Sequence, residues 1–438
     1  MNFCTFRFTL SYISFRRLYY VPAFFEMHVD TDADDLTINK LKPFEMTVLF
    51  HEYIHFLQDF ATYYGLNRIY VYSEYMHSVI NRIYRNSSDI KICVPIKIED
   101  NADNVLLNQQ IQNFTSGDDG GEYGIKDFTI SDIIEDSDPL IDNPYMTSIP
   151  NVIVSSSEGD MVIFGAIAIT ESMAYIMERL CSPSAFKKSP SFPYRAAEMV
   201  ADYYSPHFSD DPLMVLALCD MAQMSSNPGA CFVRVMKGIQ SGQLSFNSPE
   251  EIYDHFYDQI SMTMEGEQST LLLGFQRLSN VVKQQLKNYL RNMPILDTYY
   301  EWIDRLFNFA WEWRKNDRYF LLKMARHHDL STNGAFGFCI CNVGTPLMSN
   351  NRGSYFKISP KGTNVDIDVE YFKAFSQVEQ LFSQGLKGCA LYEWCCKSPQ
   401  STPSELCLST PWKKVKEERL CPYALLWKHW NLSKYDVV

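Results

Sequence analysis

The stretch VLFHEYIHFLQDF, residues 48–60, places two histidines and a glutamate inside an otherwise apolar and aromatic run. The surrounding segment 46–64 contains neither glycine nor proline, and its apolar residues recur at helical spacing. Pro43 stands just upstream, where the first turn of a helix accepts proline. The pattern therefore predicts a helix that carries three titratable side chains into an apolar environment.

The two histidines of this helix, His51 and His55, are four residues apart. Positions i and i+4 lie on one face of a helix, so both imidazoles can reach a single metal ion. Glu52 is angled off that face and can reach water bound to the ion, as a general base does. The alternative is a pair of hydrogen-bonded core or surface histidines. We favour the metal site, because two unpaired histidines and a carboxylate are costly to bury.

A third protein ligand is expected, because a catalytic zinc ion usually has three protein ligands and one open position. Two glutamates compete for this role. Glu171 is the only charged residue of segment 161–177, and a carboxylate in so apolar a helix needs a cation or strong donors to stay ionised. Glu74 lies among tyrosines and near two arginines, which can pair with it. The sequence thus favours Glu171 and leaves Glu74 as the alternative.

The two segments HEYIH (residues 51–55) and ESMAYIME (residues 171–178) resemble the zincin superfamily of zinc metallopeptidases, in particular its gluzincin branch. In that branch the third zinc ligand is a glutamate on a second helix, which often reads E-x-x-A-x-x-x-E. Glu171, Ala174 and Glu178 fit this frame. The resemblance implies that Glu171 is the ligand, and that an insertion separates the two helices. It covers about thirty residues in two short segments.

Composition sets limits on the function. The chain has 438 residues, of which 46% are hydrophobic and 21% charged, as in globular proteins, and its formal net charge is −13. An acidic chain is not expected to bind nucleic acid or anionic membranes. The N-terminus lacks the pattern of a signal peptide, and no apolar run is long enough to cross a bilayer. We therefore expect a cytoplasmic protein whose twelve cysteines are reduced.

The expected fold class is α+β and predominantly helical, with a zincin-like core. Three regions are predicted: a catalytic region 1–190 with an acidic insertion 115–150, a helical region 191–330 that completes the cleft, and a Cys/Trp-rich region 331–438. The acidic insertion is read as a loop, either solvated or acting as a flap over the cleft. The shorter elements expected are strands at 91–99 and 150–156, and helices at 101–114, 196–204, 212–224, 229–239 and from 248 onward.

Further residues are candidates for supporting roles. A peptidase needs a donor for the developing oxyanion, and the candidates are Tyr175, Tyr203, Tyr204 and His207. Gln58 and Asp59 lie within reach of His55 and could orient an imidazole, although solvent exposure is the preferred interpretation of both. His255, His327 and His328 have no partner at ligand spacing and are interpreted as structural or surface residues.

The C-terminal region is rich in cysteine. GAFGFCICNVGTP, residues 334–346, is interpreted as a buried strand with Cys339 and Cys341 on one face. Five further cysteines follow within 33 residues: Cys389, Cys395, Cys396, Cys407 and Cys421. They could hold a second, structural zinc ion, but the absence of a C-x-x-C pair favours buried free thiols.

These observations predict a zinc metallopeptidase. His51, His55 and Glu171 would bind one catalytic Zn²⁺, Glu52 would act as general base, and the substrate would be a protein or peptide. Two alternatives remain: a zinc hydrolase of a non-peptide amide or ester, which uses the same machinery, and a non-catalytic zinc-binding regulatory or interaction protein. The presence of Glu52 argues against the latter, because a structural zinc site needs no base. The oligomeric state cannot be predicted.

Overall fold

Helix α1 (Pro43–Ala61) begins at the proline that the sequence places in its first turn. The Glu45 carboxylate accepts a hydrogen bond from the backbone N–H of Lys42 (2.8 Å) and another from the Thr31 hydroxyl (2.6 Å), which fixes the start of the helix. All side chains from Met46 to Ala61 are buried. The helix therefore runs through the core of the protein, and the predicted helix around the histidine motif is confirmed.

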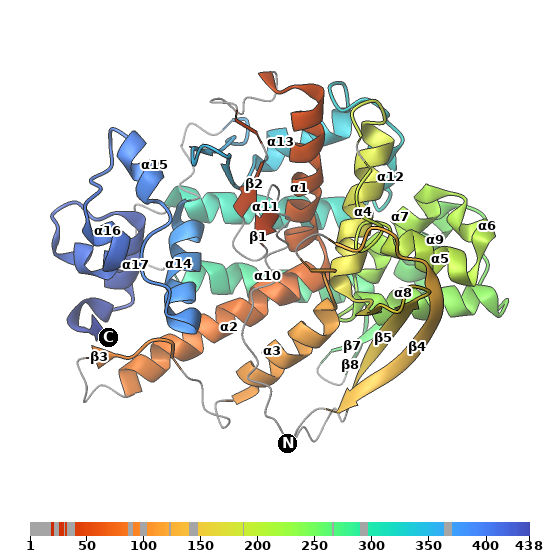
Figure 1. Ribbon diagram of the computed structural model, residues 1–438, viewed down its shortest axis with the longest axis horizontal. Coiled ribbons are helices and arrows are strands. Elements are labelled where there is room, and N and C mark those ends of the chain that lie inside the picture. The colour runs from red at the N-terminus through yellow and green to blue at the C-terminus, as the bar shows by residue number, and fades with distance from the viewer. Residues whose placement is uncertain are drawn as a thin grey trace.

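The computed structural model describes residues 19–21, 26–29, 31–32, 40–85, 91–96, 103–121, 124–139, 148–186, 188–264, 267–289, 297–362 and 370–438. Helices dominate these residues and the sheets are small, as expected for a predominantly helical α+β protein (Figure 1). The helices after α1 are α2 (Tyr63–Arg85), α3 (Asp103–Ser116), α4 (Ala166–Cys181), α5 (Ala196–Tyr204), α6 (Pro206–Ser209), α7 (Pro212–Ala222), α8 (Pro228–Gln240), α9 (Pro249–Gln259), α10 (Leu271–Tyr289), α11 (Asp297–Asn316), α12 (Phe320–Ala325), α13 (Gly334–Val343), α14 (Glu370–Gln384), α15 (Tyr392–Lys397), α16 (Leu406–Ser409) and α17 (Pro422–His429), with 3₁₀ helices η3 (Pro411–Lys416) and η4 (Leu432–Lys434).

The strands within the described residues form four small sheets. Their bounds are β1 (Tyr19–Val21), β2 (Glu26–His28), β3 (Lys91–Ile92), β4 (Ile130–Pro139), β5 (Ser148–Ser156), β6 (Met161–Ile163), β7 (Ser261–Met264), β8 (Glu267–Thr270), β9 (Leu347–Ser349), β10 (Tyr355–Phe356) and β11 (Asp436–Val437). The sheet orders are β1-β2-β9-β10, β4-β5-β6, β3-β11 and β7-β8. Two of these sheets join early and late parts of the chain, because β2 pairs with β9 and β3 pairs with β11.

Helix α4 packs beside α1, and the two run next to each other in Figure 1. Small residues on α4, including Ala168 and Ala174, are fully buried and allow a close approach. At one end of the pair, the hydroxyls of Thr47 and Ser182 are hydrogen-bonded at 2.6 Å. At the other end, a β carbon on Gly65 would lie 2.3 Å from the carbonyl oxygen of Gln58, so glycine is needed where α2 begins against α1.

The acidic insertion is not a loop throughout, and that prediction is wrong for residues 130–139. These residues form β4, which pairs antiparallel with β5 over its whole length. Ile130 and Ile133 pack against the core, which gives the strand an apolar side that its many carboxylates conceal in the sequence. The predicted strand 150–156 is confirmed as β5. Strand β6 then leads directly into α4.

Other expectations had mixed outcomes. Helices α3, α5, α7, α8 and α9 match the predicted ranges closely, and the Ser248 hydroxyl caps α9 as expected. In the predicted strand 91–99, β3 spans Lys91–Ile92, and residues 97–99 lie outside the described part of the chain. The prediction of a strand at 334–346 is wrong, because residues 334–343 form α13. The Asn333 side chain caps this helix by accepting the N–H of Phe336, a local signal that the apolar composition obscures.

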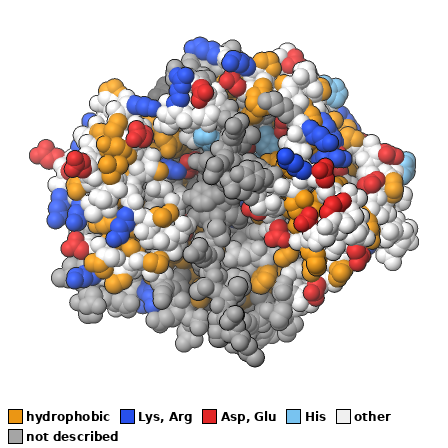
Figure 2. All heavy atoms as spheres, in the orientation of Figure 1, with side chains coloured by type: hydrophobic (Ala, Val, Ile, Leu, Met, Phe, Trp, Pro, Cys, Tyr) orange, Lys and Arg blue, Asp and Glu red, His pale blue; other side chains and the backbone are white. Residues whose placement is uncertain are grey.

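Charged side chains of both signs are interspersed on the face of the molecule shown in Figure 2. Within the described ranges, none of the helices combines the length and apolar character needed to cross a bilayer. All eleven cysteines in these ranges are free of disulfide bonds.

Glu379 on α14 provides a test of how the C-terminal region packs. Its side chain is 3% exposed, and its Oε2 atom has no hydrogen-bond partner within the described ranges. Burial raises its pKa to about 7. The pKa of Glu379 is thus higher in the folded protein than in the unfolded chain, where it is about 4.5. This difference stabilises the folded state at low pH, and the stabilisation is lost as the pH rises through 7. Glu379→Gln should therefore raise the free energy of unfolding at pH 8 by about 3 kcal/mol relative to wild type, and far less at pH 5.

Urea unfolding of both chains between pH 5 and pH 8 measures this difference. Glu393→Gln is the matched control, because Glu393 is exposed and should show no pH-dependent difference. An equal effect of Glu379→Gln at both pH values would contradict the prediction.

Candidate metal centre

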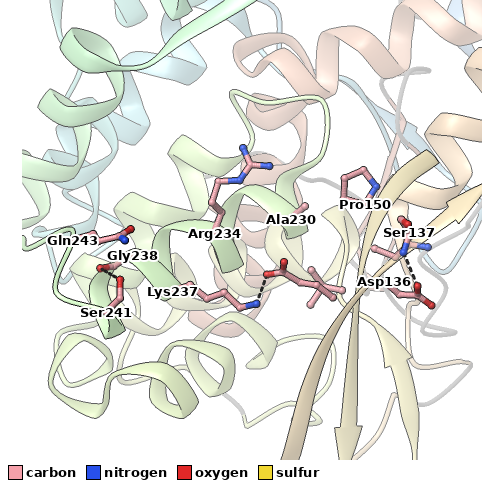
Figure 3. Close-up of a pocket in the computed structure, with 12 residues that line it drawn as sticks. Asp136, Ser137, Pro150, Ala230, Arg234, Lys237, Gly238, Ser241 and Gln243 are labelled. Carbon is pink, nitrogen blue, oxygen red and sulfur yellow. Dashed lines mark hydrogen bonds and ion pairs between the residues drawn. The ribbon is translucent and has the colours of Figure 1, made fainter. Parts of the chain in front are cut away.

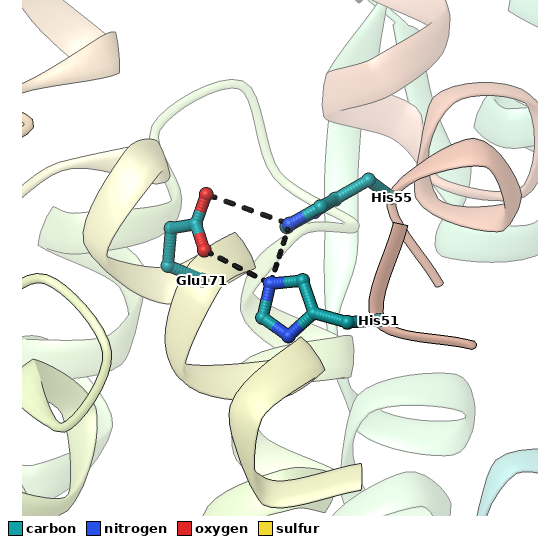
Figure 4. Close-up of side chains that lie close together, drawn as sticks. All are labelled: His51, His55 and Glu171. Atoms are coloured by element: carbon teal, nitrogen blue, oxygen red, sulfur yellow. Dashed lines mark hydrogen bonds and ion pairs between the residues drawn. The ribbon is translucent and has the colours of Figure 1, made fainter. Parts of the chain in front are cut away.

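The candidate site is formed by side chains from α1 and α4. His51 and His55 extend from adjacent turns of α1 toward Glu171 on α4 (Figure 4). Glu171 Oε2 lies 3.3 Å from His51 Nε2, and Glu171 Oε1 lies 3.4 Å from His55 Nε2. The two Nε2 atoms are 3.3 Å apart. The structure thus brings together the three residues that the sequence selected as ligands.

Two polar residues orient the imidazoles. Glu178, on α4, has its Oε2 atom 3.0 Å from His51 Nδ1. Gln58, on α1, places its Oε1 atom 2.8 Å from His55 Nδ1, and its amide nitrogen donates to the carbonyl oxygen of Thr170 (3.1 Å). Oxygen acceptors at both Nδ1 atoms favour a proton there, which leaves both Nε2 lone pairs facing Glu171.

This arrangement calls for a cation. Two imidazole lone pairs and a carboxylate converge within 3.4 Å of one another, and neutral imidazoles could not offer Glu171 a hydrogen bond there. Burial opposes the ionisation of Glu171, but the two imidazoles lower its pKa to about 2. Burial likewise opposes protonation of His51, and the Glu171 and Glu178 carboxylates nevertheless raise its pKa. A metal ion would satisfy all three ligands without protonating the histidines.

Glu52 lies beside this cluster and is also buried, with 3% of its surface exposed. Its Oε2 atom has no hydrogen-bond partner among the described residues. Burial raises the pKa of Glu52 to about 7, although His55 and His51 act in the opposite direction. An unsatisfied buried carboxylate oxygen is costly, and a buried group with a shifted pKa beside a candidate metal site is a candidate functional residue.

Glu74, the alternative third ligand, lies elsewhere. Its carboxylate accepts hydrogen bonds from the Tyr70 hydroxyl (2.5 Å) and the Asn108 amide (3.4 Å), so its polar atoms are occupied by neighbours on α2 and α3. Among the described residues, His51, His55 and Glu171 are the one group of three whose candidate ligand atoms all lie within 4.8 Å of one another.

The preferred interpretation of Gln58 and Asp59 as exposed residues is wrong, since they are 4% and 0% exposed. Gln58 orients His55, which was the alternative role. Asp59 instead pairs with Arg68 at 2.7 Å. Both errors arise because α1 is buried on every side, which its sequence alone does not reveal.

The sequence missed Tyr194, which stands on the segment between α4 and α5. Its ring centroid lies 5.9 Å from that of His51, and burial together with the Glu171, Glu52 and Glu178 carboxylates raises its pKa. A tyrosine in a chain with 27 of them gives no local signal. The contact exists because the chain folds back after α4.

The four residues that the sequence suggested as oxyanion donors lie in different surroundings from one another. Tyr175 is buried and packs its ring against Phe186 and Tyr194. Tyr203 is 41% exposed, Tyr204 packs against Tyr203, and His207 is exposed on α6. The three histidines interpreted as structural or surface residues, His255, His327 and His328, each have a hydrogen-bond partner near the surface.

A pocket of about 560 Å³ lies apart from these ligands, between β4, β5 and α8 (Figure 3). Glu135 and Lys237, which form an ion pair at 2.7 Å, line it together with Arg234 and Asn151. None of the three candidate ligands lines this pocket. Both partners of the pair are about half exposed, so it contributes little to stability.

The geometry predicts the effect of removing the third ligand. Glu171→Ala should lose one equivalent of bound metal per chain, because two imidazoles alone bind a divalent ion far more weakly than three ligands do. Elemental analysis of chains purified without chelators measures this content. Glu74→Ala is the matched control and should retain the metal of wild type. Loss of metal in Glu74→Ala but not in Glu171→Ala would contradict the assignment.

A His/His/Glu donor set suits zinc, and two histidines with one carboxylate also serve as the ligands of non-haem iron. The described residues thus contain a buried group that could hold a metal ion. No known family model, curated protein or solved structure matches this chain.

Proposed function

We propose that this protein is a zinc-dependent peptidase. The observation that carries the proposal is the buried Oε2 atom of Glu52, which has no hydrogen-bond partner in the described part of the chain and lies beside the His51, His55 and Glu171 cluster. A structural metal site has no use for such a group, and an iron site with the same ligands does not require it. A hydrolase requires a base at this position.

The residues have distinct roles in this proposal. His51, His55 and Glu171 hold the ion, and Glu178 and Gln58 hold the imidazoles in orientation. When bound, zinc supplies Lewis acidity, lowering the pKa of water and polarising a carbonyl oxygen. Glu52 removes a proton from the attacking water and returns it to the leaving amine. The proton taken up in the first step is released in the second, so the carboxylate is regenerated.

The environment of Glu52 suits this exchange. A general acid–base group works best when its pKa lies near the working pH, and burial brings the pKa of Glu52 to about 7. The burial of all four central side chains also keeps bulk water away from the developing charge. Tyr194, whose ring centroid lies 5.9 Å from that of His51, is the candidate donor of a hydrogen bond to an oxyanion.

The zincin resemblance supports the same assignment. It implies that a glutamate on a second helix completes the site, and Glu171 on α4 lies against both histidines. The zincin-like core and the gluzincin type are part of this proposal. Other zinc hydrolases share the same machinery, so the peptide substrate must be tested directly.

The experiment incubates wild-type and Glu52→Gln chains, both reconstituted with zinc, with a complex mixture of peptides. Mass spectrometry then identifies new peptide termini. Termini that form only with wild type support a peptidase. Hydrolysis of model amides or esters without peptide cleavage would instead support a non-peptide hydrolase. If wild type and Glu52→Gln behave alike on every substrate while both hold zinc, the proposal is wrong and a non-catalytic role follows.

A further inference from the structure

Four cysteines from four short segments converge in the C-terminal region. Cys389 precedes α15, Cys395 lies within it, Cys407 is on α16, and Cys421 directly precedes α17. The backbone N–H of Cys389 donates to the carbonyl oxygen of Cys407 at 2.7 Å, which brings two of these segments together. Each of the six pairs among the four thiols interacts electrostatically. In Figure 1, α15, α16 and α17 lie together at one end of the molecule.

Backbone amides near two of the four sulfur atoms favour the thiolate form. The backbone N–H of Leu391 lowers the pKa of the Cys389 thiol. The backbone N–H groups of Tyr423 and Ala424 act in the same direction on Cys421, whose side chain makes no capping hydrogen bond to α17. A nearby backbone N–H stabilises a thiolate more than a neutral thiol. The amides near Cys389 and Cys421 therefore partly offset the effect of burial on these two thiols.

The thiolate form nevertheless needs a cation here. Burial raises the pKa of the Cys389 thiol to about 12 and also raises those of Cys395 and Cys421. The buried Lys414 ammonium favours the Cys421 thiolate, but it already pairs with the Glu417 carboxylate at 2.6 Å. This ammonium cannot balance four thiolates, whereas a divalent metal ion would bind all four sulfur atoms directly and compensate half of their charge.

The architecture of this region would benefit from a cross-link. Helices α15, α16 and α17 have six, four and eight residues, so regular backbone hydrogen bonding contributes little to their stability. The aromatic contacts of Trp427 with Trp412 and Tyr423 support η3 and α17, but they do not include α15. A metal ion held by cysteines from each segment would tie the three helices together.

We propose that Cys389, Cys395, Cys407 and Cys421 form a tetrathiolate site for a structural zinc ion. Zinc–sulfur bonds of about 2.3 Å in a tetrahedron place the sulfur atoms about 3.8 Å apart. The four sulfur atoms are spaced more widely than this, since no three of them lie within 4.8 Å of one another. Coordination therefore draws the short helices inward. Each thiol gives up its proton to solvent on binding, so up to four protons are released per ion.

The first test separates this site from the His/His/Glu site by zinc content. Full-length Glu171→Ala, reconstituted with zinc and freed of excess, should retain about one zinc per chain. Adding Cys407→Ser and Cys421→Ser should remove it, whereas adding Cys396→Ser should not. Cys396 is the matched control, because it adjoins Cys395 in α15 but is exposed. Glu171→Ala without any zinc would overturn the tetrathiolate site without bearing on the peptidase proposal.

A second test uses wild type and does not depend on the folding of a variant. The chain is treated with a thiol-alkylating reagent with and without zinc, and the modified cysteines are mapped by mass spectrometry. Zinc should protect Cys389, Cys395, Cys407 and Cys421 at least tenfold in rate, while Cys396 reacts equally in both samples. Equal alkylation of the four thiols in both samples, or disulfide bonds among them in the purified chain, would overturn the proposal.

Discussion

Replacing Glu52 with glutamine should lower the rate of peptide hydrolysis by about 10²- to 10⁴-fold and leave the metal content unchanged. Glutamine has nearly the same shape as glutamate but cannot accept a proton. Glu52 is not one of the three residues whose ligand atoms converge, so its charge is not needed to hold the ion. Only the proton transfer should be lost.

The measurement pairs kcat/KM on a cleaved peptide with zinc content from elemental analysis. Glu74→Gln is the matched control, because it removes a part-buried carboxylate whose partners lie on α2 and α3. This control should keep activity within about twofold of wild type. A Glu52→Gln chain that holds zinc and cleaves peptides at the wild-type rate would remove the basis for the proposed mechanism.

Three residues of the candidate metal centre could be predicted from the sequence because their signal is local. His51, Glu52 and His55 lie on one helix, where spacing alone determines direction. Glu171 was harder to assign, since 115 residues separate it from His55. It was identified because a single charge within an apolar segment needs a partner, and that argument does not depend on the path of the chain.

The remaining features depend on tertiary contacts that leave no pattern in the sequence. Tyr194 approaches His51 only because the chain turns back between α4 and α5. The acidic residues of β4 hide an apolar side that becomes evident once β5 is paired with it. Helix α13 has the composition of a buried strand, and its capping residue Asn333 is the signal that could have corrected the prediction. The periodicity of apolar residues thus predicted helices correctly, whereas residue composition alone gave the wrong predictions for β4 and α13.

The second large effect is expected at a buried ion pair that contacts the C-terminal end of α1. Both guanidinium Nη atoms of Arg314, on α11, lie 2.8 Å from the carboxylate oxygens of Asp220 on α7, and both side chains are at most 1% exposed. The Nε–H of Arg314 donates to the carbonyl oxygen of Ala61, the last residue of α1 (2.7 Å). The pair thus joins three helices, one of which carries both histidines.

Asp220→Asn should lower the free energy of unfolding by about 3–5 kcal/mol, because it leaves the Arg314 charge buried without a counter-charge. Urea unfolding measures this loss. Asp258→Asn is the matched control: Asp258 also pairs with an arginine, Arg318, but is 61% exposed, so the expected loss is below about 1 kcal/mol. Similar losses in the two variants would contradict the prediction.

The double variant Asp220→Leu, Arg314→Met separates the effect of the two buried charges on stability from the effect of the hydrogen bond between Arg314 and the end of α1. Removing both charges removes the cost of desolvating them. The free energy of unfolding of this double variant should therefore be closer to that of wild type than the free energy of unfolding of Asp220→Asn is. It also removes the hydrogen bond to the carbonyl oxygen of Ala61. If stability returns but zinc affinity falls, the guanidinium serves mainly to hold the end of α1 in place. If both return, apolar packing against α7 and α11 is sufficient to position the histidines.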